Sequence, residues 1–349
     1  MDKSGKSIEL IGKVHNHCNH LYQLGFKLLA LGFSDGKSFI PLDFSIHNEP
    51  GKKGTRGMKK KDLDNQFSKT RKETSPSSLR ISQVACNKII IGLSMIKSAV
   101  KITKNIKYVL ADSWFICEQF ISEIQQIKSE KETPIHVIGL MQTNRLVTVG
   151  KEKMLANKIP DVKQKLIKYS SKMKCYYIPL QVHYKGIKLK GFWIKMKNQN
   201  TWKLLICTDQ KLSFIQAMKY YQIRWSIEVF FKECKQNLGL NSCQSKDFDA
   251  YISHITIVLM NYSTLAIRKR FDDYETLGAL FRETQRAFLE ATLIEKIWQL
   301  MPCIFNSILA KLGVDWELLI REFIENQSEI NNAIMKAFDG LFATPQRAT

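Results

Sequence analysis

The sequence predicts an α/β protein with a β-rich insertion and a C-terminal helical region. Three stretches carry this prediction. Residues 106–111 form a short apolar run of the kind found in buried strands, and helical periodicity follows at about 114–130. Residues 134–207 alternate in the manner of strands, with a helical patch near 160–170. From 247 to about 340 the apolar positions recur at the three- and four-residue steps of helices.

The N-terminal part continues the α/β pattern. Residues 21–33 and 37–46 are apolar and β-prone, and the Asp35-Gly36 pair between them predicts a hairpin turn. Residues 50–78 are poor in apolar residues and rich in Lys, Arg, Gly and Ser. This basic loop either contacts a DNA backbone or is simply solvated. Residues 79–103 have the periodicity of a helix.

Composition indicates a globular protein with a polyanionic partner. The 349 residues are 44% hydrophobic, and 53 Lys and Arg face 32 Asp and Glu for a net charge of +21. That excess favours nucleic acid over a membrane surface. We expect no membrane partner, because apolar runs such as 89–93 are too short to span a bilayer and no signal peptide is apparent.

The cysteine and histidine content indicates no structural metal. Eight cysteines without a C-x-x-C pair are typical of free thiols in a reducing cytoplasm. A dense cluster, His15, His17, Cys18 and His20, could begin a zinc site, but a zinc site needs a second ligand pair at suitable spacing and the sequence offers none.

The stretch 221–235 is the most informative part of the chain. Tyr221, Arg224, Glu228 and Lys235 stand at offsets 0, 3, 7 and 14. At about 100° per residue they share one narrow arc of a helix, while Phe230 points to the opposite side and can anchor the helix in a core. A carboxylate flanked by two cations and a phenol suits a metal-bound phosphodiester. The alternative is an amphipathic helix with a charged outer face.

This segment resembles the Y-(2)-R-(3)-E-(6)-K signature of insertion-sequence transposases of the IS4-like DDE group. The stretches at 31–45, 108–115, 207–209 and 236–240 resemble the same group. The resemblance implies a ribonuclease-H-like catalytic core interrupted by the β-rich insertion. The expected division is 1–133 for the first part of the core, 134–207 for the insertion, 208–245 for the catalytic helix that completes the core, and 246–349 for the C-terminal helical region.

The resemblance also assigns roles at the site. Asp112 and Glu228 match the second and third acids that hold two Mg²⁺ ions, and Tyr221, Arg224 and Lys235 match the DNA-end contacts. Taken alone, Asp112 could instead be a helix N-cap.

The first acid of the family has no counterpart here. It lies on the first strand of the core, and we expect that strand upstream of residue 1 in an N-terminally truncated chain. The strands at 21–33 and 107–111 would then lose a shared neighbour and expose unpaired edges. Substitutes are poor: Asp35 belongs to the turn, Asp43 would lie roughly 14 Å from Asp112 across three strand spacings, and no strand fixes Asp2.

Several neighbouring residues have structural explanations. Trp114 and Trp225 could stack on an unpaired base, although burial in the core is the favoured reading. His136 and Cys207 are expected in the β-rich core. Asp209 is expected to cap the helix that follows it.

The sequence therefore predicts a transposase that cleaves and joins DNA at element ends with Mg²⁺, impaired by the missing first Asp. The alternative is a non-catalytic DNA-binding remnant or regulator of an intact copy, and a third reading is a junction resolvase of the same fold. Expected partners are double-stranded transposon ends, target DNA and a second copy in a homodimer. The expected location is the cytoplasm, in association with the nucleoid.

Overall fold

A computed structural model describes residues 1–16, 19–51, 54–103, 105–128, 133–271 and 276–287, together with 295 and 297. The chain divides into two units, Met1–Gly278 and Ala279–Thr349. In the second unit residues 279–287 are helical, and the remainder of the expected C-terminal helices lies outside the described residues. His17 and Cys18 of the candidate zinc cluster also lie outside them.

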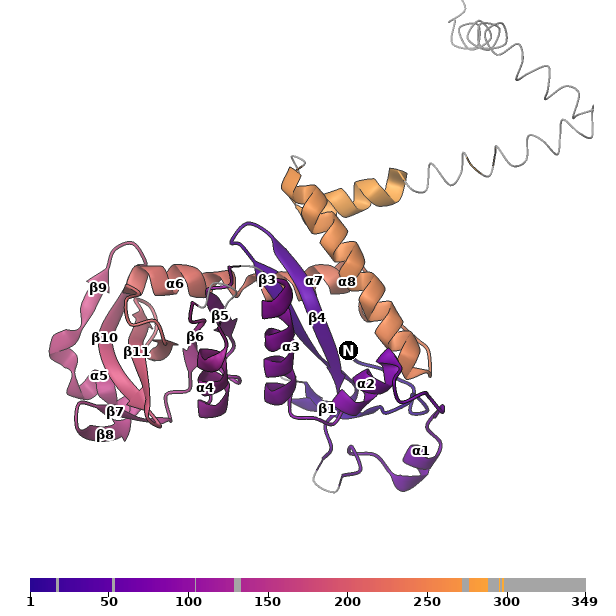
Figure 1. The fold of residues 1–349 in the computed structure, drawn as a ribbon, viewed down its shortest axis with the longest axis horizontal. Helices are drawn as coiled ribbons and strands as arrows, with labels where there is room; N and C mark the ends of the chain where they lie inside the picture. The colour runs from indigo at the N-terminus through magenta and orange to yellow at the C-terminus, as the bar shows by residue number, and fades with distance from the viewer. Residues whose placement is uncertain are drawn as a thin grey trace, which may run out of the picture. The chain divides into compact units, whose positions relative to one another are not determined.

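The N-terminal half of the first unit contains two hairpins and four helices (Figure 1). Its strands are β1 (Gly12–Asn16), β2 (Leu21–Gly25), β3 (Lys27–Ser34), β4 (Phe39–His47) and β5 (Tyr108–Ala111). Its helices are α1 (Lys60–Asp64), α2 (Pro76–Gln83), α3 (Lys88–Ile102) and α4 (Glu118–Gln126). The predicted turn at Asp35-Gly36 is confirmed: Asp35 accepts hydrogen bonds from the Lys37 and Ser38 amides, and Gly36 takes a positive φ of 89°.

The predicted β-rich insertion forms most of an eight-stranded sheet. Its strands are β6 (His136–Met141), β7 (Leu146–Val149), β8 (Glu152–Leu155), β9 (Lys168–Ser170), β10 (Cys175–Tyr184), β11 (Ile187–Met196) and β12 (Lys203–Cys207). The order is β5-β6-β12-β11-β10-β7-β8, with β9 on β10. Strand β5 pairs with β6 in parallel, whereas β6, β12, β11 and β10 pair antiparallel. The short helices η1 (Ala156–Lys158), α5 (Ile159–Val162) and η2 (Gln164–Leu166) account for the helical patch.

The insertion is followed by the helices α6 (Phe214–Ile223), α7 (Ser226–Gln236) and α8 (Phe248–Phe271). Phe230 on α7 is fully buried, as predicted, and packs against Phe39 and Tyr262 with ring centroids 5.3 and 4.9 Å away. It belongs to a core cluster built from β3, β4, α7 and α8, while a second cluster fills the β5–β12 sheet against α3 and α4.

Helix α8 corrects one expectation. It is 24 residues long and, by length and composition alone, apolar enough to cross a membrane, so the expectation that every apolar segment is too short was wrong. One of its faces contacts β4 and α7 and buries Tyr251, Ile255, Val258 and Tyr262 in the core cluster. Core helices of soluble proteins have this character, so α8 is weak evidence for a membrane.

The basic loop at 50–78 is partly built into the fold. It contains α1, and Arg71 is 8% exposed between Glu9, Asp247 and Asp249, with N–O distances of 2.6 to 3.1 Å. Lys69 pairs with the same two aspartates. Neither a DNA contact nor simple solvation describes Lys69 and Arg71, because these two cations join the loop to the start of α8.

The two sheets of the core are not joined. Strand β3 pairs with β4, and β5 pairs with β6, but within the described residues β3 and β5 share no strand between them. In Figure 1, β5, β6 and α4 lie between the strands β10 and β11 and the β3–β4 hairpin. The result is a mixed α/β architecture in which one edge of β3 and one edge of β5 remain unpaired among the described residues. This was expected for 107–111 and for the part of 21–33 that forms β3, whereas residues 21–25 form a separate strand, β2, that pairs with β1.

Candidate functional site

Asp112 follows β5 directly and begins a tight turn. Its Oδ1 accepts a hydrogen bond from the Ser113 amide at 2.7 Å, and the Phe115 amide donates to the Asp112 carbonyl. Helix α4 begins only at Glu118, with Cys117 as its N-cap, so the helix-cap explanation of Asp112 is wrong. The carboxylate is exposed at the C-terminal end of its strand.

The motif helix is interrupted in its middle. Helix α6 starts with a capping box in which Ser213 and Gln216 satisfy each other's backbone amides. At its end the Arg224 amide donates to the Tyr221 carbonyl and the Trp225 amide to the Gln222 carbonyl, both at 3.0 Å. These i to i−3 bonds tighten the turn before α7 begins at Ser226. The expectation that 221–235 lie on one unbroken helix was therefore wrong.

Arg224 forms the centre of a polar group at this turn. Its Nη1 lies 2.6 Å from Glu228 Oε1, and its guanidinium lies over the Tyr221 ring, 5.4 Å from the centroid. Burial, the largest single effect, would lower the pKa of Arg224, but the hydrogen bond with Glu228 together with the charges of Tyr221, Glu228 and Asp112 raises the pKa. Burial is the main reason that the pKa of Tyr221 is raised, and the Asp112 charge acts in the same direction. Asp112 therefore belongs to the same electrostatic group.

Three polar atoms of this group are buried without a hydrogen-bond partner among the described residues. They are Tyr221 Oη, Arg224 Nε and Glu228 Oε2. An unpaired buried polar atom costs on the order of 1–3 kcal/mol, so a concentration of three on one turn of chain needs an explanation. A ligand that supplies both a cation and acceptor oxygens would satisfy all three.

Lys235 lies two turns beyond Glu228 on α7, where it is exposed. Its charge acts on the amino group of Met1 and lowers the pKa of that group, after the larger effect of burial. The structure thus gathers Asp112, Tyr221, Arg224 and Glu228, and leaves Lys235 at the far end of the same helix.

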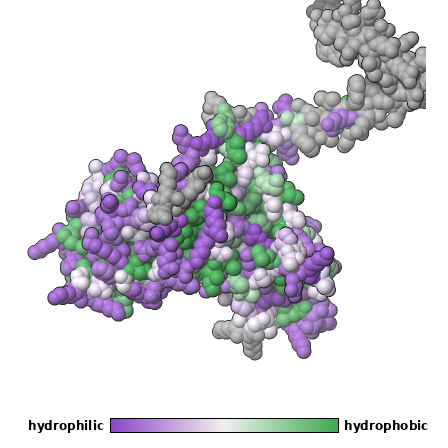
Figure 2. Space-filling model, in the orientation of Figure 1, coloured by the Kyte–Doolittle hydropathy of each residue, from purple (hydrophilic) through white to green (hydrophobic). Residues whose placement is uncertain are grey.

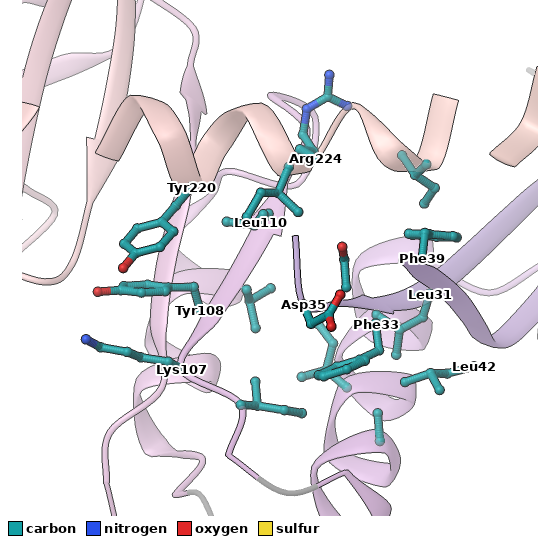
Figure 3. Close-up of a pocket in the computed structure, with 18 of the residues that line it drawn as sticks. Leu31, Phe33, Asp35, Phe39, Leu42, Lys107, Tyr108, Leu110, Tyr220 and Arg224 are labelled. Carbon is teal, nitrogen blue, oxygen red and sulfur yellow. The ribbon is translucent and has the colours of Figure 1, made fainter. Parts of the chain in front are cut away.

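A cavity of about 340 Å³ joins Asp112, Arg224 and Glu228 to β3. A second cavity, of about 570 Å³, continues between β3 and β5 and is lined mainly by apolar side chains. In Figure 3, Tyr108, Leu110 and Tyr220 stand on one side of it, and Leu31, Phe33 and Asp35 on the other. The unpaired edges of β3 and β5 therefore face an open, apolar space beside the polar group.

The remaining aspartates take other places. Asp35 pairs with Arg270 at 2.7 Å, and Asp43 pairs with Arg80 at 2.6 Å. Asp2 is exposed and forms an isolated antiparallel bridge with Gly25. Within the described residues, none of the three aspartates joins Asp112 and Glu228 in a cluster of acidic side chains.

The two tryptophans were expected in the core, and this was wrong. Trp114 is 53% exposed in the turn after Asp112, and Trp225 is 64% exposed at the junction of α6 and α7. Each is held at a turn, where the chain directs the indole outward and not against a packed layer. Both flank the polar group, so the base-stacking alternative remains open.

Asp209 was also misassigned. Helix α6 begins five residues later, at Phe214, with Ser213 as its N-cap, so Asp209 does not cap this helix. It accepts hydrogen bonds from the Lys211 amide at 2.9 Å and the Tyr108 hydroxyl at 3.0 Å. Burial favours the neutral acid, but these bonds lower the pKa of Asp209.

Cys207 is fully buried, as expected, while His136 is only half-buried on β6. The sequence did not single out Tyr108 as a partner of Asp209, because only its place in a strand distinguishes it.

The donor set fits a divalent cation only in part. Asp112 and Glu228 offer the hard oxygen ligands that Mg²⁺ prefers, and one Glu228 oxygen is unpaired. Yet nowhere in the described part of the chain do three or more His, Cys, Asp or Glu side chains come together as metal ligands need to. Two carboxylates fall short of the roughly three that a two-ion site requires, so the residues present do not fit the two-ion arrangement.

Comparison with known proteins gives one informative result. No curated protein matches the sequence. Residues 92–263, from α3 to most of α8, match the family model of the transposase DDE domain. That segment includes Asp112 and the whole α6–α7 turn, and the mixed sheet with its helices is consistent with such a domain. Members of this family bind DNA and generally use divalent metal ions, so the match supports a DDE transposase.

Proposed function

We propose that the chain is an insertion-sequence transposase of the IS4-like group that acts on the ends of its element through the Asp112–Glu228 group. The observation that carries the proposal is the set of three buried polar atoms on Tyr221, Arg224 and Glu228 that have no partner among the described residues, beside the exposed carboxylate of Asp112. A phosphodiester with its cation would supply what each atom lacks.

Each residue has a defined task in this proposal. Asp112 and Glu228 would hold a divalent cation, which when bound supplies charge neutralisation at a reacting phosphate. Arg224 would bind a phosphate oxygen through Nε while Nη1 keeps Glu228 in place. Tyr221 would donate a hydrogen bond from its hydroxyl to a phosphate oxygen of the DNA backbone. Lys235, further along α7, would contact another phosphate.

We further propose that strand cleavage is impaired, because no third acid lies at the group among the described residues. The cavity between β3 and β5 is the place where a strand carrying such an acid would fit. Met1–Lys3 already form an antiparallel ladder with Leu24–Phe26, in which Met1 and Phe26 exchange hydrogen bonds of 2.9 and 3.1 Å. A strand that continued this ladder would run along β3 on the edge that β4 leaves free.

The second candidate function is a DNA-binding remnant or a regulator of an intact transposase. The same shortage of acids favours it. Under this reading Tyr221, Arg224 and Lys235 retain end-binding, and Glu228 serves only to position Arg224. We also propose double-stranded element ends and target DNA as partners, a second copy in a homodimer, and the cytoplasm with the nucleoid as the location.

The test measures binding and cleavage of a labelled duplex that carries the terminal repeat of the element. We expect Mg²⁺-independent binding that weakens in Arg224→Ala, with little or no cleavage. Unchanged binding in Arg224→Ala would refute the assigned role. Cleavage that is abolished by both Glu228→Ala and Glu228→Gln would refute impairment.

A strand fused ahead of Met1 tests the cavity. Two fusions would differ in one residue, an Asp or an Asn placed opposite Asp112. If the cavity accepts a strand, both should raise thermal stability, and only the Asp version should restore Mg²⁺-dependent cleavage. Equal activity from both versions would show that the third acid is not what the site lacks.

A further inference from the structure

The insertion carries most of the net positive charge of the chain. Residues 134–207 contain 15 Lys and Arg against two acidic residues, so this fifth of the sequence holds +13 of the net +21. Residues 162–208 contain 11 lysines and no Asp or Glu. Figure 2 shows hydrophilic residues over most of the visible face of the insertion, at the end where Figure 1 places β9, β10 and α5.

Strand register gathers aromatic rings and lysines at one end of the insertion sheet. Tyr169 on β9 lies opposite Tyr176 on β10, which lies opposite Lys195 on β11. Residues opposite each other on neighbouring strands share a face. The two tyrosine rings are 5.2 Å apart, and Lys195 Nζ lies 5.7 Å from the centre of the Trp202 ring. The rings of Tyr169, Tyr176 and Trp202 and the ammonium group of Lys195 thus form a row across β9, β10, β11 and the residue that precedes β12.

Two further lysines flank this row. Lys174 precedes β10 and Lys197 follows β11, and the pairing of Cys175 with Met196 brings these strand ends side by side. Both lysines are exposed, and Tyr169 is 50% exposed. We call Lys174, Lys195, Lys197, Tyr169 and Tyr176 the lysine–tyrosine surface.

The positive charge of this surface is not neutralised within the described fold. Of the insertion lysines in that part of the chain, Lys185 alone forms an ion pair, with Glu118 at 2.9 Å. Like charges held close together repel one another, and this cost is recovered when a polyanion binds and releases its counterions. Rings that stand among the cations offer flat surfaces for bases.

We infer that the lysine–tyrosine surface is a second DNA-binding site, separate from the Asp112–Glu228 group. Its lysines bind backbone phosphates, and Tyr169 stacks on an unpaired base next to the duplex. The choice of DNA among polyanions rests on the proposed function, whereas the surface itself does not. A membrane would suit a cationic patch with an apolar face beside it, but this one is a sheet end with isolated rings.

Two triple variants with equal charge loss test the inference. K174Q/K195Q/K197Q alters the surface, and K151Q/K153Q/K158Q removes three exposed lysines elsewhere in the insertion. The probe is a labelled duplex with a single-stranded thymidine tail, bound to the full chain over a range of salt concentrations. Each lost phosphate contact should reduce the slope of log affinity against log salt by about 0.9, so the first variant should lose roughly 2.7 and the control much less.

Tyr169→Ala provides the second readout. It should weaken binding to the tailed probe roughly tenfold and leave binding to a blunt duplex unchanged. Equal slopes for the two triple variants would mean that net charge alone governs binding, and would overturn the inference. Binding to phosphatidylserine vesicles without binding to DNA would overturn it as well.

End-binding by Arg224→Ala keeps the two proposals apart. If Arg224→Ala binds the element end as tightly as the parent chain while the two triple variants differ in salt slope, the inference is retained and the role proposed for the Asp112–Glu228 group is lost. If Arg224→Ala weakens end-binding while both triple variants bind alike, the reverse holds. Circular dichroism of each variant would verify that the fold is unchanged.

Discussion

The two sides of the core differ in how completely their strands are paired. In the eight-stranded sheet the path from β5 to β8 is continuous, and Trp193, Leu204 and Ile206 at its centre are fully buried. On the other side β3 and β4 pair only with each other, and every residue of β3 is half-buried. A cavity of about 570 Å³ separates the two. The polar group of Asp112 and Arg224 lies at this border, where packing is least complete.

The largest expected effect comes from a matched pair of leucine truncations. Leu204→Ala in the closed sheet should lower the free energy of unfolding by about 2–5 kcal/mol, because it leaves a cavity in packed surroundings. Leu31→Ala beside the existing cavity should cost no more than about 1.5 kcal/mol, because its side chain is only half-buried. Urea denaturation of both variants would measure the difference. Equal losses would contradict the comparison.

Acid should weaken the β3–β4 side through His47. Burial, and to a lesser extent the charge of Lys88, lower the pKa of this histidine from 6.5 to about 4. Between these values the unfolded chain binds a proton that the folded chain does not, so stability is full above pH 6.5 and falls toward pH 4, by about 3 kcal/mol in all. Urea titrations at pH 7 and 5 would measure this loss.

The matched control for the acid prediction is His47→Gln, which removes the titrating group. It should flatten the pH dependence between pH 7 and 5 while the fold at pH 7 is kept. If the variant and the parent lose stability equally over this range, another group is responsible.

The smallest expected effect on stability is that of Trp225→Ala. The side chain is 64% exposed, so unfolding free energy should change by no more than about 0.5 kcal/mol. If the indole stacks on a base at the DNA end, binding to that end should nevertheless weaken at least fivefold. Thermal melts and fluorescence anisotropy would measure the two quantities. A large loss of stability without a loss of binding would restore the structural reading of this tryptophan.

Much of the secondary structure followed from the sequence because it depends on local chemistry. The hairpin at Asp35-Gly36, the strand before Asp112 and the alternating insertion strands all appear where periodicity and turn residues predict them. The buried position of Phe230 followed from helical spacing alone. The identity of the polar group was also predictable, since Asp112, Tyr221, Arg224 and Glu228 were named from spacing and resemblance.

Tertiary structure decided the rest, because periodicity reports average burial and not the identity of neighbours. The Arg224 amide bonds to the Tyr221 carbonyl and tightens the turn between α6 and α7. The Tyr108 hydroxyl donates a hydrogen bond to the Asp209 carboxylate, and Arg71 forms an ion pair with Glu9. The open space between β3 and β5 depends on which strand edges meet, a long-range property that no single stretch encodes. The sequence by itself thus indicated which residues form the polar group, while the three-dimensional fold decided which of their polar atoms are hydrogen-bonded and which have no partner among the described residues.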